Sequence, residues 1–407
     1  MKMKKYKLGD VIDVTRGTSL KGAFYATDGK YIRLTCGNFD YRNNCFKLNN
    51  SKDDLFYQGE FRDEFLLEKG DLITPLTEQA IGLLGSTAWI PESGKYIQSQ
   101  DIAKIICNEE LINKEFAYYL ISSNMVKQQL AAAAQQTKIR HTSPDKIKEC
   151  IVWLPSLAEQ KRIGQLLFDI DRKIELNRAI NHNLEAMAKQ LYDYWFVQFD
   201  FPDKNGRPYK SSGGKMVWNE KLKREIPDGW KVANIRRVLD KVITTPRVST
   251  AEYLLSGSYP VIDQTSDVYC AGFTERQDAV VNQYPAVVFG DHSCAVKYVN
   301  FPFARGADGT QVILSKEKNV SIEYLYYVVK DVKIRKGYAR HFSFLKEHPI
   351  ILPSETEAKK FQGTVQILFE QITRNRKENL SLTKLRDELL PLLMNGQVSV
   401  NYDLSHD

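Results

Sequence analysis

The chain has 407 residues, of which 43% are hydrophobic and 26% charged, and its net charge is +7. This length suits two or three domains that each bury a core, and no run of about 18 apolar residues is present to span a membrane. The basic segment Met1–Lys5 is followed by no apolar stretch, so we expect no signal peptide and no membrane partner. The mild positive charge permits a polyanionic partner without requiring one.

The cysteines are scattered, and no two form a C-x-x-C pair: Cys36, Cys45, Cys107, Cys150, Cys270 and Cys294. A disulfide framework or a zinc site is therefore not expected, and a reducing cytoplasm is the expected location.

Residues 1–155 form the first predicted globular domain, which mixes helices and strands. Alternating apolar residues and turn signals predict these strands: Val11–Thr15, Tyr31–Thr35, Asp71–Thr74 and Ile102–Cys107. A helix is predicted from Asn113 to Gln136, because its alanine-rich end favours helix.

Residues 156–196 form the first long predicted helix. Ser156 and Glu159 have the spacing of a capping box, in which each side chain bonds a free backbone N–H at the start of the helix. Apolar residues then recur with a 4-3-4-3 spacing, which is typical of a coiled-coil seam. The seam consists of Ile163, Leu167, Ile170, Ile174, Asn177, Asn181, Leu184, Ala188, Leu191 and Trp195.

Residues 197–227 are predicted to be a connector, since the stretch from Phe201 to Trp230 is polar and rich in Gly, Lys and Pro. A second globular domain, 228–353, follows, with strands expected at Val261–Ile262 and Ala286–Phe289 and a helix at Ser321–Lys333.

Residues 354–396 form the second long predicted helix, before a tail at 397–407. It repeats the first without a gap at an offset of 198 residues, and Ser354 with Glu357 repeats the capping box. Its seam consists of Phe361, Val365, Leu368, Ile372, Asn375, Asn379, Leu382, Arg386, Leu389 and Leu393. Arg386 departs from the pattern, and we expect it at a frayed or partner-facing end.

Each seam carries two asparagines at its middle, and buried seam asparagines fix the register of a coiled coil. The asparagines align in both a parallel and an antiparallel pair, so they do not choose between the two. The pseudo-twofold symmetry of a duplicated chain favours antiparallel. The alternative is that each helix packs only on its own domain.

The sequence argues against an enzyme in its own right. It has no Pro-Pro dipeptide for a methyltransferase motif, no G-x-G-x-x-G loop, and only an incomplete phosphate loop at Gly213-Gly214-Lys215. Pro144-Asp145 with Glu159-x-Lys161 resembles a nuclease motif, but the capping box already explains Glu159. The histidines have no metal-ligand spacing, so no metal and no cofactor are expected in this chain.

Three stretches resemble the specificity subunits of type I restriction–modification systems. They are the helix opening Leu154–Ile163, the segment Asp171–Asn177, and the connector that runs from Phe201-Pro202 through Gly213-Gly214 to Glu225–Trp230. The order of domain, helix, domain, helix is similar too. Thr356-Glu357-Ala358-Lys359 departs from the family's Glu-Gln-Lys opening in the second helix.

The resemblance implies an α+β protein of two mixed α/β target recognition domains, separated by two long antiparallel coiled-coil helices in a pseudo-twofold tandem repeat. Each domain is expected to read one half of a split, asymmetric site on double-stranded DNA. The chain is expected to be inactive alone and to join two methyltransferase subunits, which hold S-adenosylmethionine. Motor–nuclease subunits that use ATP and magnesium would complete the restriction enzyme.

Arginine, lysine and amide side chains are the residues that hold phosphates and read bases. In the first domain the candidates are Lys21, Arg33, Asn38, Arg42, Gln79, Gln98, Gln100, Lys138, Arg140 and His141. In the second domain they are Arg247, Gln264, His292, Lys297, Arg305, Gln311, Arg335, Lys336, Arg340 and His341. The pairs Arg140-His141 and Arg340-His341 stand out because they recur, although a shared cap or hinge before the helix would also explain them.

The first seam is about 50 Å long, and one turn of duplex is about 34 Å, so the helices are expected to act as a ruler between half-sites. Tyr192, Tyr194, Trp195 and Phe196 are expected to divide between core packing and docking of a methyltransferase. The alternatives are a stand-alone DNA-binding regulator with two domains and a scaffold that binds no nucleic acid.

Overall fold

The computed structural model describes residues 2–41, 43–78, 82–133, 140–242, 244–266, 268–306, 308–334 and 341–400. The chain divides into two compact units, Met1–Lys173 with Ser381–Asp407, and Ile174–Leu380. The helices α4 (Leu157–Tyr192) and α8 (Glu355–Met394) each contribute residues to both units. Each unit is described by itself.

Two sheets dominate the first unit. An antiparallel sheet has the order β11-β9-β13-β2, with bounds Ala88–Trp89, Leu72–Pro75, Ile102–Cys107 and Ile12–Arg16. A second sheet has the order β3-β7-β4-β12-β8, with bounds Tyr25–Ala26, Phe56–Tyr57, Tyr31–Arg33, Tyr96–Ile97 and Leu66–Leu67. In this sheet β4 and β12 are parallel, and the other neighbours are antiparallel. The remaining pairs are β5 (Phe39–Asp40) with β6 (Cys45–Phe46) and β10 (Thr77–Glu78) with β14 (Arg140–His141).

The helices of the first unit pack on the antiparallel sheet. They are α1 (Lys114–Ser122), α2 (Asn124–Ala133) and α3 (Pro144–Lys148). The single helix predicted from Asn113 is interrupted at Ser123, whose extended backbone ends α1 and whose hydroxyl donates to the Leu120 carbonyl. The start of α4 approaches α1 so closely that a Cβ on Gly164 would lie 2.8 Å from the Phe116 nitrogen, so this contact requires glycine.

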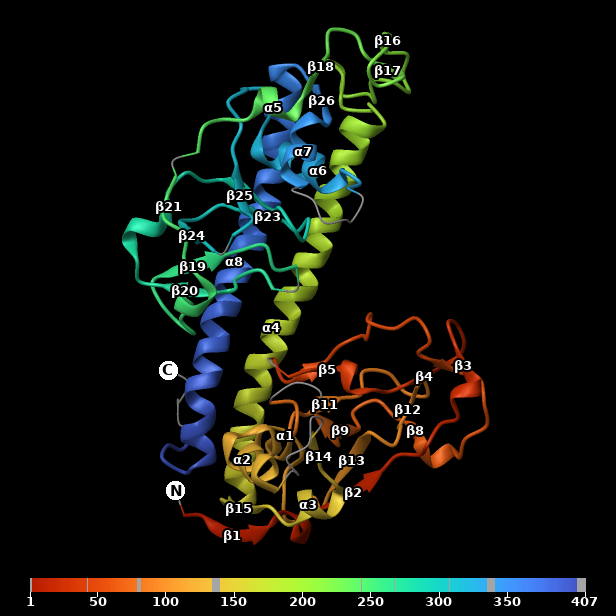
Figure 1. Cartoon of the computed structure of the whole chain (residues 1–407), viewed down its shortest axis with the longest axis vertical. Helices are drawn as coiled ribbons and strands as arrows, with labels where there is room; N and C mark the ends of the chain where they lie inside the picture. The colour runs from red at the N-terminus through yellow and green to blue at the C-terminus, as the bar shows by residue number, and fades with distance from the viewer. Residues whose placement is uncertain are drawn as a thin grey trace. The chain divides into compact units, whose positions relative to one another are not determined.

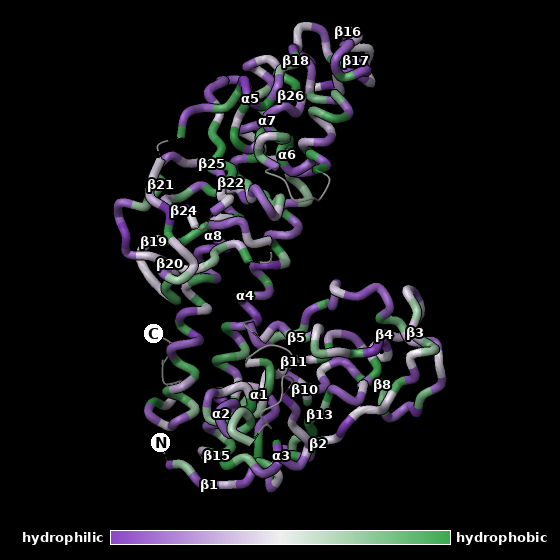
Figure 2. The backbone as a smooth tube through the Cα atoms, in the orientation of Figure 1, coloured by the Kyte–Doolittle hydropathy of each residue, from purple (hydrophilic) through white to green (hydrophobic). Residues whose placement is uncertain are grey.

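The second unit also has two main sheets (Figure 1). One has the order β20-β19-β24-β21, with bounds Gly272–Thr274, Tyr259–Ile262, Phe303–Arg305 and Val280–Val281. The other has the order β23-β22-β25, with bounds Val296–Val299, Ala286–Gly290 and Thr310–Ile313. All five residues of β22 are buried, and its tube is green, hence hydrophobic, in Figure 2. Three helices complete this domain: α5 (Ile235–Val238), α6 (Ile322–Asp331) and α7 (His341–Glu347).

The two domains share a topology that their sequences do not reveal. The strand orders β7-β4-β12-β8 and β20-β19-β24-β21 are the same, and each places its parallel pair in the middle. The orders β11-β9-β13-β2 and β23-β22-β25 also agree, and an isolated bridge from Leu239 to Ser315 stands in the second unit where β2 stands in the first. The second domain therefore repeats the strand order of the first.

Each domain is closed by its first and last strands. Strand β1 (Lys4–Lys7) pairs with β15 (Ile151–Leu154), and β18 (Lys231–Asn234) pairs with β26 (Pro349–Leu352). In both pairs a lysine lies opposite the leucine of the Leu-Pro-Ser sequence, Lys4 with Leu154 and Lys231 with Leu352. The long helix therefore leaves each domain from the same edge.

The predicted connector is folded rather than open. After a π-helical turn at Asp193–Val197, it forms a hairpin of β16 (Met216–Asn219) and β17 (Arg224–Pro227). Phe199, Phe201 and Trp230 are buried in the core of the second unit, and the Phe201 and Trp230 rings stack with centroids 4.9 Å apart. Aromatic residues within the polar run therefore anchor the connector on the second unit.

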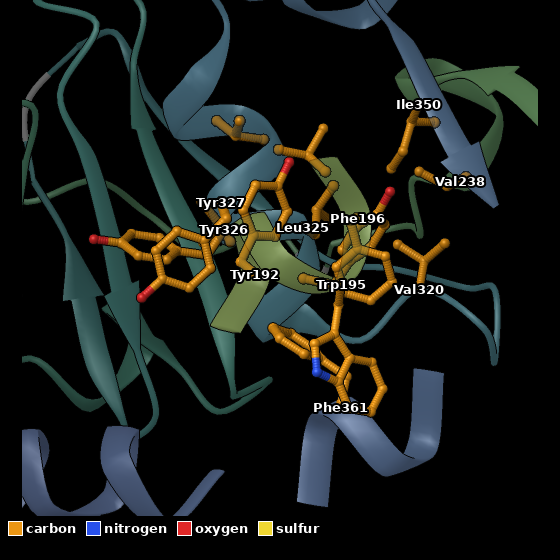
Figure 3. Close-up of a cluster of buried hydrophobic side chains, with 14 of the residues drawn as sticks. Tyr192, Trp195, Phe196, Val238, Val320, Leu325, Tyr326, Tyr327, Ile350 and Phe361 are labelled. Atoms are coloured by element: carbon orange, nitrogen blue, oxygen red, sulfur yellow. The ribbon is translucent and has the colours of Figure 1, made fainter. Parts of the chain in front are cut away.

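Figure 3 shows the centre of this core, where Tyr192, Trp195 and Phe196 of the first helix meet Phe361 of the second. The Phe196 and Phe361 rings contact edge to face, with centroids 4.8 Å apart. Of the aromatic cluster predicted to divide between core and docking, these three first-helix residues are buried, and Tyr194 is exposed.

Candidate nucleic-acid interface

The two long helices pair through their asparagines in the second unit. Asn177 Nδ2 donates to Asn379 Oδ1 at 2.9 Å, and Asn375 Nδ2 donates to Asn181 Oδ1 at 2.8 Å. Residue numbers rise along α4 as they fall along α8, so these segments run antiparallel. Because each amide finds a matching amide, only one register satisfies both pairs.

The starts of both helices are capped by the predicted serines. The Glu159 N–H donates to Ser156 Oγ, and the Glu357 N–H donates to Ser354 Oγ, both at 3.3 Å. Gln160, which follows Glu159, is buried and binds the Leu111 and Pro155 carbonyls and the Asn113 N–H of the first unit.

Arg386 lies on the predicted seam and is buried in the first unit. Its Nη1 donates to Asp171 Oδ1 at 2.7 Å, and the Tyr119 hydroxyl donates to Asp171 Oδ2 at 2.7 Å. Burial lowers the pKa of Arg386, but Asp171 and Asp387 outweigh this effect and raise it. The expectation of a frayed or partner-facing end is wrong, since α8 continues to Met394 and Arg386 is 8% exposed.

The second unit brings together four predicted DNA-contacting residues beside its two sheets: Arg247, Gln264 and His292 on loops, and Arg305 at the end of β24. The Gln264 amide joins three loops, because its Oε1 accepts the His292 N–H at 3.2 Å and its Nε2 donates to the Asp308 carbonyl at 2.8 Å. Arg247 forms an ion pair with the exposed Asp308. Gln264 therefore braces the cluster, and the arginines supply its positive charge.

A buried ion pair fixes the loop that carries Gln264. Lys297 Nζ lies 3.7 Å from Asp263 Oδ1, and both side chains are buried. Burial lowers the pKa of Lys297, and the nearby Asp263 opposes that shift. Lys297, predicted to contact DNA, thus holds Asp263 inside the domain.

The recurrent Arg-His pair of the first unit lies on β14, beside an acidic residue that the sequence analysis missed. Glu78 is buried, its Oε2 lies 3.5 Å from Arg140 Nη1, and its Oε1 accepts the Gly82 and Leu83 N–H groups. His141 is exposed, and its Nδ1 lies 3.4 Å from Thr77 Oγ1.

His341, of the second Arg-His pair, lies in a different local structure from His141. His341 starts α7 and is 4% exposed, and its N–H donates to the Asp291 carbonyl. Asp291 Oδ1 accepts the Phe342 N–H at 2.7 Å. In each unit an acidic residue after a central strand, Glu78 or Asp291, anchors this segment. A carboxylate within three residues of the end of a buried strand was the available sequence signal for both.

Three further candidates are buried with their polar groups bound inside the first domain. Arg33 donates to the Asp54 carbonyl and stacks 3.8 Å from the Tyr25 ring centroid. Asn38 donates to the Lys47 carbonyl, and Gln98 donates to the Thr15 carbonyl. Like Lys297 and His341, these side chains are buried inside their domain, so we do not propose any of the five as DNA contacts.

The remaining candidates are scattered or undescribed. Lys21 and Gln100 are exposed on separate loops, and Gln311 is half-buried on β25 opposite Phe289. Six candidates lie outside the described residues: Arg42, Gln79, Lys138, Arg335, Lys336 and Arg340. Among the described residues, no cluster of His, Cys, Asp and Glu could hold a metal ion, and no helix is long and apolar enough to cross a membrane.

The family model for the type I restriction modification DNA specificity domain matches residues 1–186 and 227–383. The chain therefore belongs to this family. It is 26% identical over 327 residues to the type I restriction enzyme MjaIX specificity subunit of Methanocaldococcus jannaschii. The matched region covers 74% of this chain and 73% of that protein.

A second relative is the type I restriction enzyme HindI specificity subunit of Haemophilus influenzae, 24% identical over 378 residues, with 74% of this chain and 81% of that protein covered. Among solved structures, the S subunit of a type I restriction-modification system from M. genitalium matches with a TM-score of 0.59 at 16% identity. The match covers 97% of this chain and 96% of that one. This last likeness shows a shared fold.

Proposed function

We propose that the chain selects the DNA sequence on which a type I restriction–modification enzyme acts, each domain reading one half of a split, asymmetric site. The observation that carries this proposal is the repeated domain topology with different side chains on equivalent strands. Arg305, on β24, occupies the strand position that Ile97 occupies on β12. Two domains that share a topology but carry different side chains are suited to reading two different half-sites.

The described residues suit recognition rather than catalysis. We propose that the chain is not catalytic by itself, that two methyltransferase subunits with S-adenosylmethionine supply adenine methylation, and that motor–nuclease subunits with ATP and magnesium supply cleavage. The antiparallel helices α4 and α8 would form a coiled coil that sets the gap between the half-sites.

A docking site for a methyltransferase subunit is proposed at the end of α4. A hollow of about 560 Å³ lies there, lined by Met187, Gln190, Leu191, Asp193, Tyr194 and Gln198. Met187 is 51% and Tyr194 36% exposed. Exposed Met and Tyr side chains beside buried aromatic residues are typical of a protein interface.

The test is methylation mapping in cells that carry the full chain together with the methyltransferase. We expect methylated adenines within one two-part asymmetric sequence, and none there when the chain is omitted. A continuous site, or methylation without the chain, would contradict the proposal. Tight sequence-specific duplex binding by the chain, with no effect on methylation, would instead indicate a stand-alone regulator.

A further inference from the structure

The loop cluster of the second unit holds buried polar atoms that lack partners. Arg305 Nε, Thr245 Oγ1 and Thr310 Oγ1 are buried and have no hydrogen-bond partner among the described residues. All three belong to one neighbourhood: Arg305 Nη2 donates to the Thr245 carbonyl at 2.8 Å, and Thr310 opens β25 directly after Gly309, whose carbonyl accepts the Asp291 N–H. Buried polar groups are nearly always hydrogen-bonded. Three buried polar atoms without partners in one loop cluster therefore indicate a ligand-binding site.

The charge at this place is positive and poorly neutralised. Burial and the charge of Arg247 both lower the pKa of Arg305, so the two guanidinium groups repel each other. Asp263 is engaged with Lys297, and Asp291 is engaged with the start of α7. Asp308 is therefore the carboxylate that remains for the two arginines.

Asp308 is held weakly at its position. It pairs with Arg247, but its side chain is 89% exposed, while that of Arg247 is 40% exposed. An exposed ion pair contributes little stability, typically below about 1 kcal/mol. A phosphate, with more acceptor oxygens, would compete for Arg247 at small cost and would also face Arg305.

We infer that Arg247 and Arg305 form a binding site for a DNA backbone phosphate. In the free protein Asp308 pairs with Arg247, and the phosphate displaces this carboxylate when DNA binds. A phosphate fits better than a base because a guanine-reading arginine needs two free parallel N–H groups. Arg305 already donates from Nη2 to the Thr245 carbonyl, so this pair of N–H groups is not free. The inference rests on the proposed function in requiring DNA as the ligand.

The test measures duplex binding by the full chain over a range of salt concentrations. Asp308→Asn should tighten binding several-fold at low salt, because it removes the competing carboxylate. Arg247→Ala should weaken binding about tenfold and reduce the salt slope by about one. Asp278→Asn is the matched control, since Asp278 is also an exposed carboxylate paired with an arginine, Arg276, in the same unit. It should change affinity far less than Asp308→Asn.

A second measurement uses inorganic phosphate against chloride at equal ionic strength, with the melting temperature of the full chain as readout. Phosphate should stabilise Asp308→Asn more than the wild type, and this gain should vanish in Asp308→Asn combined with Arg247→Ala. If the wild type binds duplex but Asp308→Asn matches Asp278→Asn in both measurements, the inference is overturned and the proposed function stands. If duplex binding is absent while the phosphate effect follows Asp308 and Arg247, the anion site stands and the DNA-reading function fails.

Discussion

At the scale of single residues, burial separates most of the predicted DNA-contacting residues into those inside a domain and those on its surface. Polar side chains that point into a domain, such as Arg33 and Gln98, find carbonyl partners there, whereas Arg247 and His292 stay on loops. The sequence cannot distinguish these cases, because a strand places successive side chains on opposite faces and the inward face is decided by distant strands.

The buried pair of Asp171 and Arg386 should be a main determinant of stability in the first unit. Removing one partner of a buried ion pair leaves an uncompensated charge and typically costs about 3–5 kcal/mol. We expect Asp171→Asn to lower the free energy of unfolding by part of that amount, because Asp171 is partly exposed and Arg386 keeps its ion pair with Asp387. Chemical denaturation of the full chain measures the change.

The control for this prediction lies on α8, the helix that carries Arg386. Lys384 pairs with Glu388 at 3.9 Å, and both side chains are well exposed, so Lys384→Ala should change stability by less than about 1 kcal/mol. Equal effects of Asp171→Asn and Lys384→Ala would show that the buried pair is not important for stability.

At the scale of elements, the predicted strands and long helices occur in the structure with small shifts of their ends, but the order of the strands in the sheets was not predicted. The strand at Ile102–Cys107 and the serine caps at Ser156 and Ser354 agree with the structure, since periodicity and caps are local signals. The shared strand order and the folded connector depend on contacts between residues far apart in sequence. Glu78 and Asp291 were missed for the same reason, because their partners come from distant segments.

The asparagine pair Asn181 and Asn375 should fix the register of α4 against α8 at some cost in stability. Asn375→Leu alone should destabilise the second unit by about 1–3 kcal/mol, because it leaves the Asn181 amide buried without its partner. Replacing both with leucine should restore or raise the melting temperature. Thermal denaturation of the wild type and the two variants checks this order, and a double variant less stable than the single one would contradict it.

At the scale of the whole molecule, the duplicated chain carries two domains of one topology joined to two paired helices. Such an architecture separates two tasks: side chains on the loops of each domain determine which bases are bound, and helix length determines the gap between the bound sequences. Changes in the loops and changes in the helices should therefore affect different properties of the recognised site.

The most direct test of this account inserts seven residues into each helix, between Lys173 and Ile174 and between Leu380 and Ser381, which preserves the seam. The methylated site is then mapped in cells that carry the methyltransferase. Because seven helical residues add about 10 Å, the account predicts unchanged half-site sequences with a gap lengthened by up to about three base pairs. An unchanged gap, or altered half-site sequences, would contradict it.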